Sequence, residues 1–424
     1  MKIIKYPPKA EWSELLQRPL LGSADIDALV SPIIEAVRMR GDDAVREYSL
    51  KFDKVLLQSF EVTETEYQNA EKSVDQELKN AIKQASDNIE AFHTMQVSAG
   101  NRVITDPGVS CWQKSLAIEK VGFYIPGGTA PLFSTVLMLA IPARIAGCKE
   151  IVLCTPPSAD GSIHPAVLYS AKVSGIKRIF KVGGAQAIAA MAYGTQTIPK
   201  VYKIFGPGNQ YVTAAKQVVS RGLVAIDMPA GPSELAVVAD ESSNPSFVAA
   251  DLLSQAEHGT DSQVLLFSNN EKIAEAVVSE VKRQVELLPR RDIAVASLKN
   301  SRCFVLGNYD EIMEMVNDYA PEHLIISTDN APELSAKIVN AGSVFIGHWS
   351  TESAGDYASG TNHTLPTSGY AKAYSGVNLD SFIKKITFQE LTREGLMNIG
   401  SAIMKMAETE NLEAHKNAVA IRIK

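Results

Sequence analysis

The sequence predicts an α/β protein with two consecutive Rossmann-like parallel-sheet domains, which lack the GxGxxG fingerprint, a helical N-terminal region and a C-terminal helical tail. From about residue 118, short β-rich runs alternate with helical ones, which is the pattern of βαβ units around a parallel sheet. The alternation breaks once, at "MPAGPSE", and then resumes. The chain has 424 residues, of which 46% are hydrophobic, which is enough for more than one domain.

The predicted elements follow in four parts. Residues 1–105 read as a helical region, because "DIDALVSPIIEAVRMRG" carries apolar residues at helical spacing. Residues 106–232 are expected to form the first α/β domain, and residues 233–349 the second, which opens with the strand "LAVVAD". Residues 350–424 combine a Gly- and Ser-rich loop, "STESAGDYASGTNHTLPTSG", with a helical tail. A polar stretch of this length inside a folded chain is more often functional than idle.

Charge and composition exclude several classes of partner. The net charge is −7 and basic residues are not concentrated anywhere, so a nucleic-acid footprint is absent. The first residues hold too short an apolar run for a signal peptide, and the most apolar segment, 130–147, is broken by Pro142 and Arg144. The sequence therefore predicts no membrane partner and a cytoplasmic location. Four cysteines without CxxC pairing predict no disulfide scaffold.

The helix "NPSFVAADLLSQAEHG" places an amide and an imidazole close together. Asn244 is a plausible N-cap, Pro245 suits the first turn, and Gly259 is expected to stop the helix. Gln255 and His258 are three residues apart and therefore point the same way. The plainer interpretation is that His258 meets the helix dipole as a cation and that Gln255 is solvated.

Other polar candidates lie near histidines. "ESAGDYASGTNH" supplies Asp356 and His363, and "ETENLEAHKNAV" supplies Glu410 and His415. Imidazole, carboxylate and amide oxygen are acceptable ligands of a borderline cation such as Zn²⁺. One possible ligand set is Gln255, His258, Asp356 and His415. Spacing alone supports it weakly, because the sequence has no HExxH and glutamine is an uncommon zinc ligand.

"YAPEHLIIST" places Glu322 beside His323 at the start of a strand. Neighbours on a strand project to opposite faces unless the backbone turns. A turn at Pro321 would bring both into one cavity, with His323 titrating near neutral pH and Glu322 accepting a proton from water. The alternative is a surface glutamate and a histidine packed under the strand.

Three glycine-bearing loops, "VGFYIPGGTAP", "VGGAQAIAA" and "FGPGNQYV", each follow a strand-like run and precede a helix. Backbone N–H groups at such a position can hold phosphate. None is a dinucleotide fingerprint, and tight βα turns would explain them equally well.

The long motifs join these separate interpretations. "IFGPGNQYVTAAK", "IDMPAGPSE", "DLLSQAEHGTDSQ", "PEHLII", "ESAGDYASGTNHTLPT" and "AHKNAV", in this order, closely resemble the histidinol dehydrogenase family over almost the whole chain. The resemblance implies a zinc-containing, NAD-dependent alcohol and aldehyde dehydrogenase of histidine biosynthesis. Such an enzyme oxidises L-histidinol through L-histidinal to L-histidine with two NAD.

The resemblance also assigns residues. The family's zinc ligands fall on Gln255, His258, Asp356 and His415. Its substrate-binding positions fall on Ser233, His323, His363, Glu410 and the same four ligands. Its NAD-binding positions fall on Tyr124, Gln186 and Asn209, one in each glycine loop.

The catalytic roles implied are those of a general base, His323, and of Glu322, which polarises the water that attacks the aldehyde. The resemblance further implies a homodimer in which the C-terminal tail brings Glu410 and His415 to the partner's site. Two other functions remain to be weighed. A zinc hydrolase would use Glu322-activated water without nicotinamide, but it would not need the three glycine loops. A non-catalytic binding protein would not need Glu322 and His323.

Overall fold

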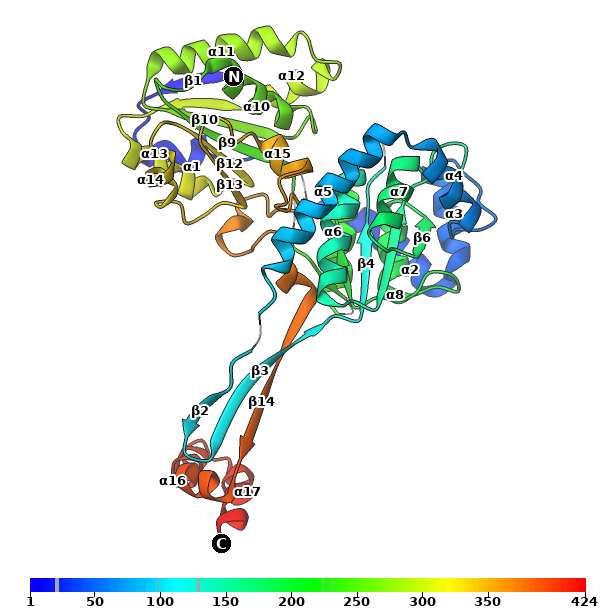
Figure 1. Ribbon diagram of the computed structural model, residues 1–424, viewed down its shortest axis with the longest axis vertical. Coiled ribbons are helices and arrows are strands. Elements are labelled where there is room, and N and C mark those ends of the chain that lie inside the picture. The colour runs from blue at the N-terminus through cyan, green and yellow to red at the C-terminus, as the bar shows by residue number, and fades with distance from the viewer. Residues whose placement is uncertain (20–22, 99, 128–129, 223, 230) are drawn as a thin grey trace.

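The structure is a computed structural model that describes the chain except residues 20–22, 99, 128–129, 223 and 230. Two α/β units lie side by side, and a long arm extends away from them and carries the C-terminus (Figure 1). Among the described residues, no helix is both long and apolar enough to cross a bilayer. The strongly apolar helix Phe133–Ala146 has 14 residues and is buried against the first sheet.

The first unit is built on a five-stranded parallel sheet in the order β6-β5-β4-β7-β8. Taken in chain order this is 3-2-1-4-5, the strand order of a Rossmann domain. The strands are β4 (Lys120–Tyr124), β5 (Glu150–Thr155), β6 (Arg178–Lys181), β7 (Lys203–Phe205) and β8 (Ala225–Ile226). The helices between them are α6 (Phe133–Ala146), α7 (Pro165–Val173), α8 (Gly184–Tyr193) and α9 (Gln210–Ser220).

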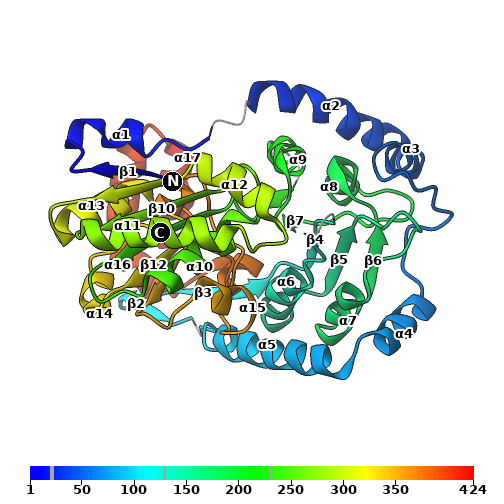
Figure 2. The same ribbon diagram turned by 90° about the horizontal axis from the view of Figure 1, so that it is seen from above.

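The N-terminal helices cover this first sheet instead of forming a body of their own. They are α2 (Ser23–Arg40), α3 (Asp42–Phe52), α4 (Glu64–Ser73) and α5 (Gln76–Thr94). Figure 2 shows α2 outside α8 and α9 on one face, and α4 and α5 outside α7 and α6 on the other. The N-terminal helices have apolar faces that must be buried. These faces pack against the outer faces of the helices between the strands of the first sheet.

The second unit repeats the same strand order and adds one strand from the N-terminus. Its parallel sheet runs β1-β11-β10-β9-β12-β13. The strands are β1 (Lys2–Lys5), β9 (Glu234–Ala239), β10 (Gln263–Ser268), β11 (Arg302–Val305), β12 (His323–Ser327) and β13 (Ser343–Ile346). The region 1–105, expected to be mainly helical, thus also contains a strand that the sequence did not predict, because Lys2–Lys5 pairs with Arg302–Val305 at the sheet edge.

Helices cover both faces of the second sheet (Figure 1). They are the short α1 (Trp12–Leu15), α10 (Pro245–Ala256), α11 (Glu271–Val285), α12 (Arg291–Lys299), α13 (Tyr309–Tyr319), α14 (Ala331–Ser335) and α15 (Glu352–Tyr357). Two separate apolar clusters, one on each face, make up the core.

The arm is an antiparallel ribbon. β14 (Ile383–Leu391) pairs with β3 (Val109–Ala117) along its whole length, and β2 (Val103–Asp106) lies on the other side of β3. The helices α16 (Arg393–Thr409) and α17 (Glu413–Ile423) lie at its tip. The tail expected to be helical thus begins with a strand. Most side chains of β14 are exposed, so the segment has no buried face that would mark it as a strand.

Candidate active site

Glu322 and His323 meet because the backbone turns just before them. Helix α13 ends at Tyr319, and Ala320 adopts a left-handed conformation with φ 51°. The chain bends again at Glu322, so the expected turn spans Ala320 to Glu322, on both sides of Pro321. His323 Nδ1 is 3.7 Å from Glu322 Oε2, and both residues are buried. The two side chains share one pocket, as the functional interpretation of the sequence requires.

Two further carboxylates close around His323. They come from α15, a helix inside the stretch that was expected to be a loop. Glu352 and Asp356 are four residues apart and lie on the same face. Glu352 Oε1 is 3.8 Å from His323 Nδ1, and Asp356 Oδ1 is 3.6 Å from His323 Nε2. Sequence reasoning missed Glu352, although its spacing from Asp356 was an available signal.

The pocket gathers three carboxyl groups around one imidazole. Burial alone would lower the pKa of His323, but Glu352, Glu322 and Asp356 raise it to about 10. Burial raises the pKa of Glu322 to about 8 and that of Glu352 well above its usual range, although His323 opposes both shifts. Burial also opposes the ionisation of Asp356, yet its contact with His323 holds its pKa below the usual value. A cation suits such a pocket.

The geometry of this pocket fits a metal ion. One ligand atom each from His323, Glu352 and Asp356 lies within 4.8 Å of the others. His323 Nε2 and Glu352 Oε2 are buried and have no hydrogen-bond partner among the described residues. Buried polar atoms are rarely left without a partner, so an ion or a substrate would satisfy them. Of this group, only Asp356 belongs to the zinc set expected from the sequence.

Helix α10 brings Gln255 to the same pocket. Asn244 caps the helix as expected and accepts from the Ser246 N–H. Oriented to satisfy both neighbours, the Gln255 amide donates to the Glu352 carboxylate and its oxygen accepts from the Glu234 N–H at 3.1 Å. Gln255 is fully buried.

His258 lies just beyond this helix. Helix α10 ends at Ala256, so the expected stop at Gly259 is wrong and His258 belongs to the turn that follows. That turn is fixed by the His258 N–H, which donates to the Gln255 carbonyl at 3.2 Å. His258 is exposed, and desolvation by the surrounding protein lowers its pKa, whereas the nearby Asp356 raises it. A neutral imidazole is the form that binds a metal.

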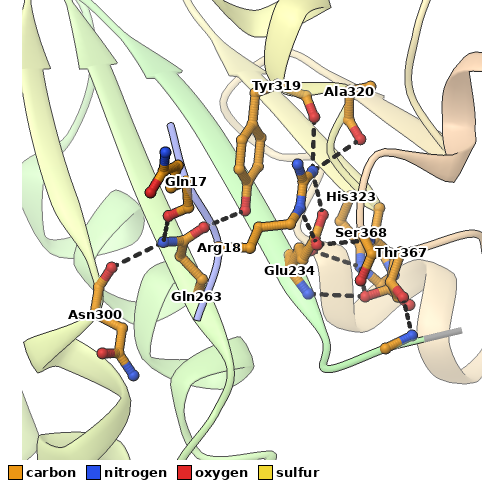
Figure 3. Close-up of polar contacts among 12 residues, drawn as sticks. Gln17, Arg18, Glu234, Gln263, Asn300, Tyr319, Ala320, His323, Thr367 and Ser368 are labelled. Carbon is orange, nitrogen blue, oxygen red and sulfur yellow. Dashed lines mark hydrogen bonds and ion pairs between the residues drawn. The ribbon is translucent and has the colours of Figure 1, made fainter. Parts of the chain in front are cut away.

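Glu234, the first residue of β9, contacts both Glu322 and His323 through its backbone, and Figure 3 shows it beside His323. Its N–H donates to Glu322 Oε2 at 2.9 Å, and its carbonyl lies 3.3 Å from His323 Nδ1. The buried Glu234 carboxylate forms a two-point ion pair with Arg18, with N···O distances of 2.5 and 2.9 Å. The Arg18 guanidinium also covers the Tyr319 ring, 4.0 Å from its centroid. No local sequence pattern links Arg18 to Glu234, which explains why sequence reasoning missed this pair.

His363 ties the pocket to the first unit. Its Nδ1 contacts the Asp356 carbonyl at 2.9 Å, and its Nε2 contacts Thr135 Oγ1 on α6 at 3.1 Å. The neighbouring Asn362 donates to the Met138 carbonyl on the same helix at 2.6 Å. Burial lowers the pKa of His363, although Asp356 raises it. The pocket therefore lies where the two units meet.

The three residues expected to bind NAD line a single cavity of about 970 Å³ at the carboxyl ends of β4 to β7. The Tyr124 hydroxyl accepts from the Gly184 N–H at 3.1 Å, and Asn209 caps α9. Gln186 is fully buried, and neither amide atom has a partner among the described residues. The cavity spans the switch point between β4 and β7, where Rossmann sheets bind ligands.

The remaining predicted residues lie apart from one another. Ser233 is half-buried directly before β9. Glu410, at the end of α16, and His415, on α17, are exposed at the tip of the arm, far from both units (Figure 1). This chain does not bring Glu410 or His415 to its own pocket.

Residues 16–423 match the family model described as histidinol dehydrogenase. The chain belongs to the histidinol dehydrogenase family. It is 62% identical over 423 residues to the histidinol dehydrogenase of Bacteroides thetaiotaomicron, covering 100% of this chain and 99% of the relative. The chloroplastic histidinol dehydrogenase of Arabidopsis thaliana is 54% identical, with 97% and 88% covered.

A solved structure agrees. The crystal structure of histidinol dehydrogenase from Elizabethkingia anophelis has a TM-score of 0.98 and 54% identity, and the match covers 100% of this chain and 98% of that chain. The resemblance seen in the sequence is thereby confirmed. Histidinol dehydrogenases are oxidoreductases of histidine biosynthesis, and none of these comparisons supports the hydrolase alternative.

Proposed function

We propose that this chain oxidises L-histidinol through L-histidinal to L-histidine with two NAD, and that it does so in the cytoplasm. One observation carries the proposal: His323 is buried among Glu322, Glu352 and Asp356, next to the unit that holds the cavity. A base, a second proton acceptor and a cation site in one pocket suit two successive oxidations of a substrate that stays bound.

Zn²⁺ is the proposed metal, held by Gln255, His258 and Asp356 of one subunit and the partner subunit's His415. The lowered pKa values of Asp356 and His258 keep the first as an anion and the second neutral, which are the ligand forms. Bound to the substrate's imidazole and amino nitrogens, zinc would fix the carbinol carbon in place, and such positioning is worth several kcal/mol. Ser233, His363 and the partner subunit's Glu410 complete the proposed substrate contacts.

His323 is the proposed general base for the alcohol. It accepts the hydroxyl proton as the carbinol C–H bond breaks and its electron pair leaves as hydride. The carboxylates that raise the pKa of His323 also attract a cation, and positive charge beside them would free His323 to act as a base near neutral pH. Glu322 accepts a proton from the water that adds to the aldehyde, which gives the hydrate for the second oxidation.

NAD is the proposed hydride acceptor, bound in the cavity of the first unit. Tyr124, Gln186 and Asn209 all line this cavity, and Gln186 offers both amide atoms without competition from a described protein partner. The nicotinamide would take up the hydride. Contacts from His363 and Asn362 to α6 keep the cavity and the catalytic pocket in a fixed relation.

A homodimer is proposed because the tail residues expected in each pocket do not reach the pocket of their own chain. The arm carries Glu410 and His415 away from their own pocket, and both are exposed at its tip. A second copy that reaches across would supply the missing metal ligand and substrate contact.

The test is the yield of NADH from limiting L-histidinol, measured before metal removal, after chelation and after zinc is restored. Two NADH per substrate, lost with the metal and recovered with zinc, is the expected result. The matched control is the Glu322→Gln protein, which should retain zinc but form NADH far more slowly. No NADH in any state of the wild-type protein would refute the proposal.

A further inference from the structure

We propose that Asp53 binds the hydroxyl groups of the adenosine ribose of NAD and thereby selects NAD against NADP. This inference rests on the proposed use of NAD in the first-unit cavity. It concerns a residue outside the catalytic pocket and outside the three expected NAD contacts.

Rossmann domains that bind NAD carry an acid near the end of the second strand, where it accepts hydrogen bonds from the ribose. The second strand here is β5, and Pro156, Pro157 and Ser158 follow it. The next acid is Asp160, which is exposed and accepts from the Ser162 N–H and hydroxyl at 2.9 and 2.7 Å. Strand β5 therefore supplies no carboxylate to the cavity.

Asp53 supplies one from a different part of the chain. It follows α3 directly, and it lines the cavity together with Pro156. A Cβ placed on Gly183 would lie 3.2 Å from Asp53 Oδ1 and 2.5 Å from the Pro156 Cβ. The carboxylate is thus adjacent to the residue that follows β5, in the place where a Rossmann domain has its ribose-binding acid.

The carboxylate retains unused acceptor capacity. It accepts from the Gly183 N–H, but Oδ2 is buried without a partner among the described residues. Burial raises the pKa of Asp53 to about 6, so the group is mostly ionised at pH 7 and above. Two ribose hydroxyls would satisfy it as donors, whereas the 2′-phosphate of NADP would bring like charge against it.

Among the described residues that line the cavity, Lys51 and His164 are the side chains that can carry positive charge, and neither is paired with Asp53. Lys51 is exposed, with its Nζ 5.4 Å from the centroid of the Phe52 ring. The His164 Nδ1 accepts from the Ala166 N–H at the start of α7. Within the described part of the chain, neither side chain forms an ion pair with Asp53.

The experiment compares wild type with Asp53→Asn and Asp53→Ser. Asparagine keeps an acceptor for the Gly183 N–H and removes the charge, and serine removes most of the side chain. The matched control is Asp160→Asn, an exposed acid after β5. For each protein, kcat/KM with NAD and with NADP is measured at saturating L-histidinol, and calorimetry gives the Kd of both dinucleotides without turnover.

We expect the preference for NAD over NADP to fall by at least about tenfold in both Asp53 variants, carried by KM and Kd more than by kcat. Asp160→Asn should keep the wild-type preference. An unchanged preference in both Asp53 variants would overturn the inference. A fall in Tm in these variants would not rescue it, because that fall would show only that the contact of Asp53 with the Gly183 N–H stabilises the fold. The proposed function would stand in that case, provided NADH still forms.

The Kd measurements separate the two proposals. If the wild type forms no NADH but discriminates between NAD and NADP through Asp53, the proposed reaction fails and the inference holds. If the wild type binds neither dinucleotide, or binds both equally, the inference is overturned whatever the turnover shows.

Discussion

Arg18→Met tests how the N-terminal segment supports the catalytic pocket. Methionine retains an apolar stem over the Tyr319 ring but removes the guanidinium that pairs with Glu234. The Glu234 carboxylate would then stay buried with backbone donors alone, the Ser368 N–H at 2.7 Å and the Glu322 N–H. Burial already raises the pKa of Glu234 even though Arg18 lowers it, so the charged form depends on Arg18.

The size of the effect follows from burial. Removing one partner of a buried ion pair typically costs about 3–5 kcal/mol, because the other charge is left uncompensated. The Glu234 side chain is 3% exposed but the Arg18 side chain is 24% exposed, so water screens part of the pair. We therefore expect Arg18→Met to lower the unfolding free energy by about 3 kcal/mol at pH 7, the lower end of this range. The double variant Arg18→Met/Glu234→Gln should recover most of this loss.

The assay is urea unfolding of the metal-free proteins followed by circular dichroism, with Arg18→Lys as the control that keeps charge but not the two-point geometry. Its stability should fall between those of the wild type and Arg18→Met. If Arg18→Met stays within about 0.5 kcal/mol of wild type, or if the double variant is no more stable than the single one, the reasoning is refuted.

Four further predictions concern the pocket and the arm. Gln255→Ala should weaken zinc retention and substrate binding, seen as a raised KM for L-histidinol, more than it weakens folding; unchanged metal content and KM would exclude Gln255 as a ligand. Burial raises the pKa of Asp251 to about 6, above its value in the unfolded chain. Ionisation of the buried carboxyl therefore lowers the stability of the fold above pH 6, and this loss disappears below about pH 4, where the group is protonated in both states. Metal-free Asp251→Asn should therefore be more stable than wild type by about 2 kcal/mol at pH 7.5 and equal to it at pH 4 in urea titrations, and a pH-independent difference would contradict this. Glu322→Gln should reduce kcat by about 10²-fold or more with zinc content unchanged, and wild-type kcat would exclude a proton-transfer role. His415→Ala should lose zinc without changing the secondary structure seen by circular dichroism, and full zinc retention would argue against a tail ligand.

The fold class followed from the sequence because its evidence is local. Strands β4, β5 and β9 are short apolar runs between turns and helices, so each could be recognised by itself. Strands β1 and β14 could not be recognised in this way. Their partners, β11 and β3, lie hundreds of residues away, and neither strand has a fully buried face.

The contacts in the pocket also fall into those that local sequence predicts and those that it does not. Glu322 and His323 share a short motif, and a turn beside them was enough to predict that they meet. The contact of Gln255 with Glu352, and that of Arg18 with Glu234, require the folded chain. The end of α10 also differs from expectation, because Glu257 caps the helix in an ordinary right-handed conformation and no glycine is needed there.

The pairing of β14 with β3 sets the length of the arm. β14 and β3 pair without a shift from Ile383 opposite Ala117 to Leu391 opposite Val109, a span of roughly 30 Å. Deleting two residues from each strand would keep every side chain on its face, yet move the tip by about 7 Å. A metal ligand has a tolerance of a few tenths of an ångström. In the proposed dimer, where His415 reaches the partner subunit's metal site, the arm must therefore keep its number of residues, while its outward-facing residues can vary.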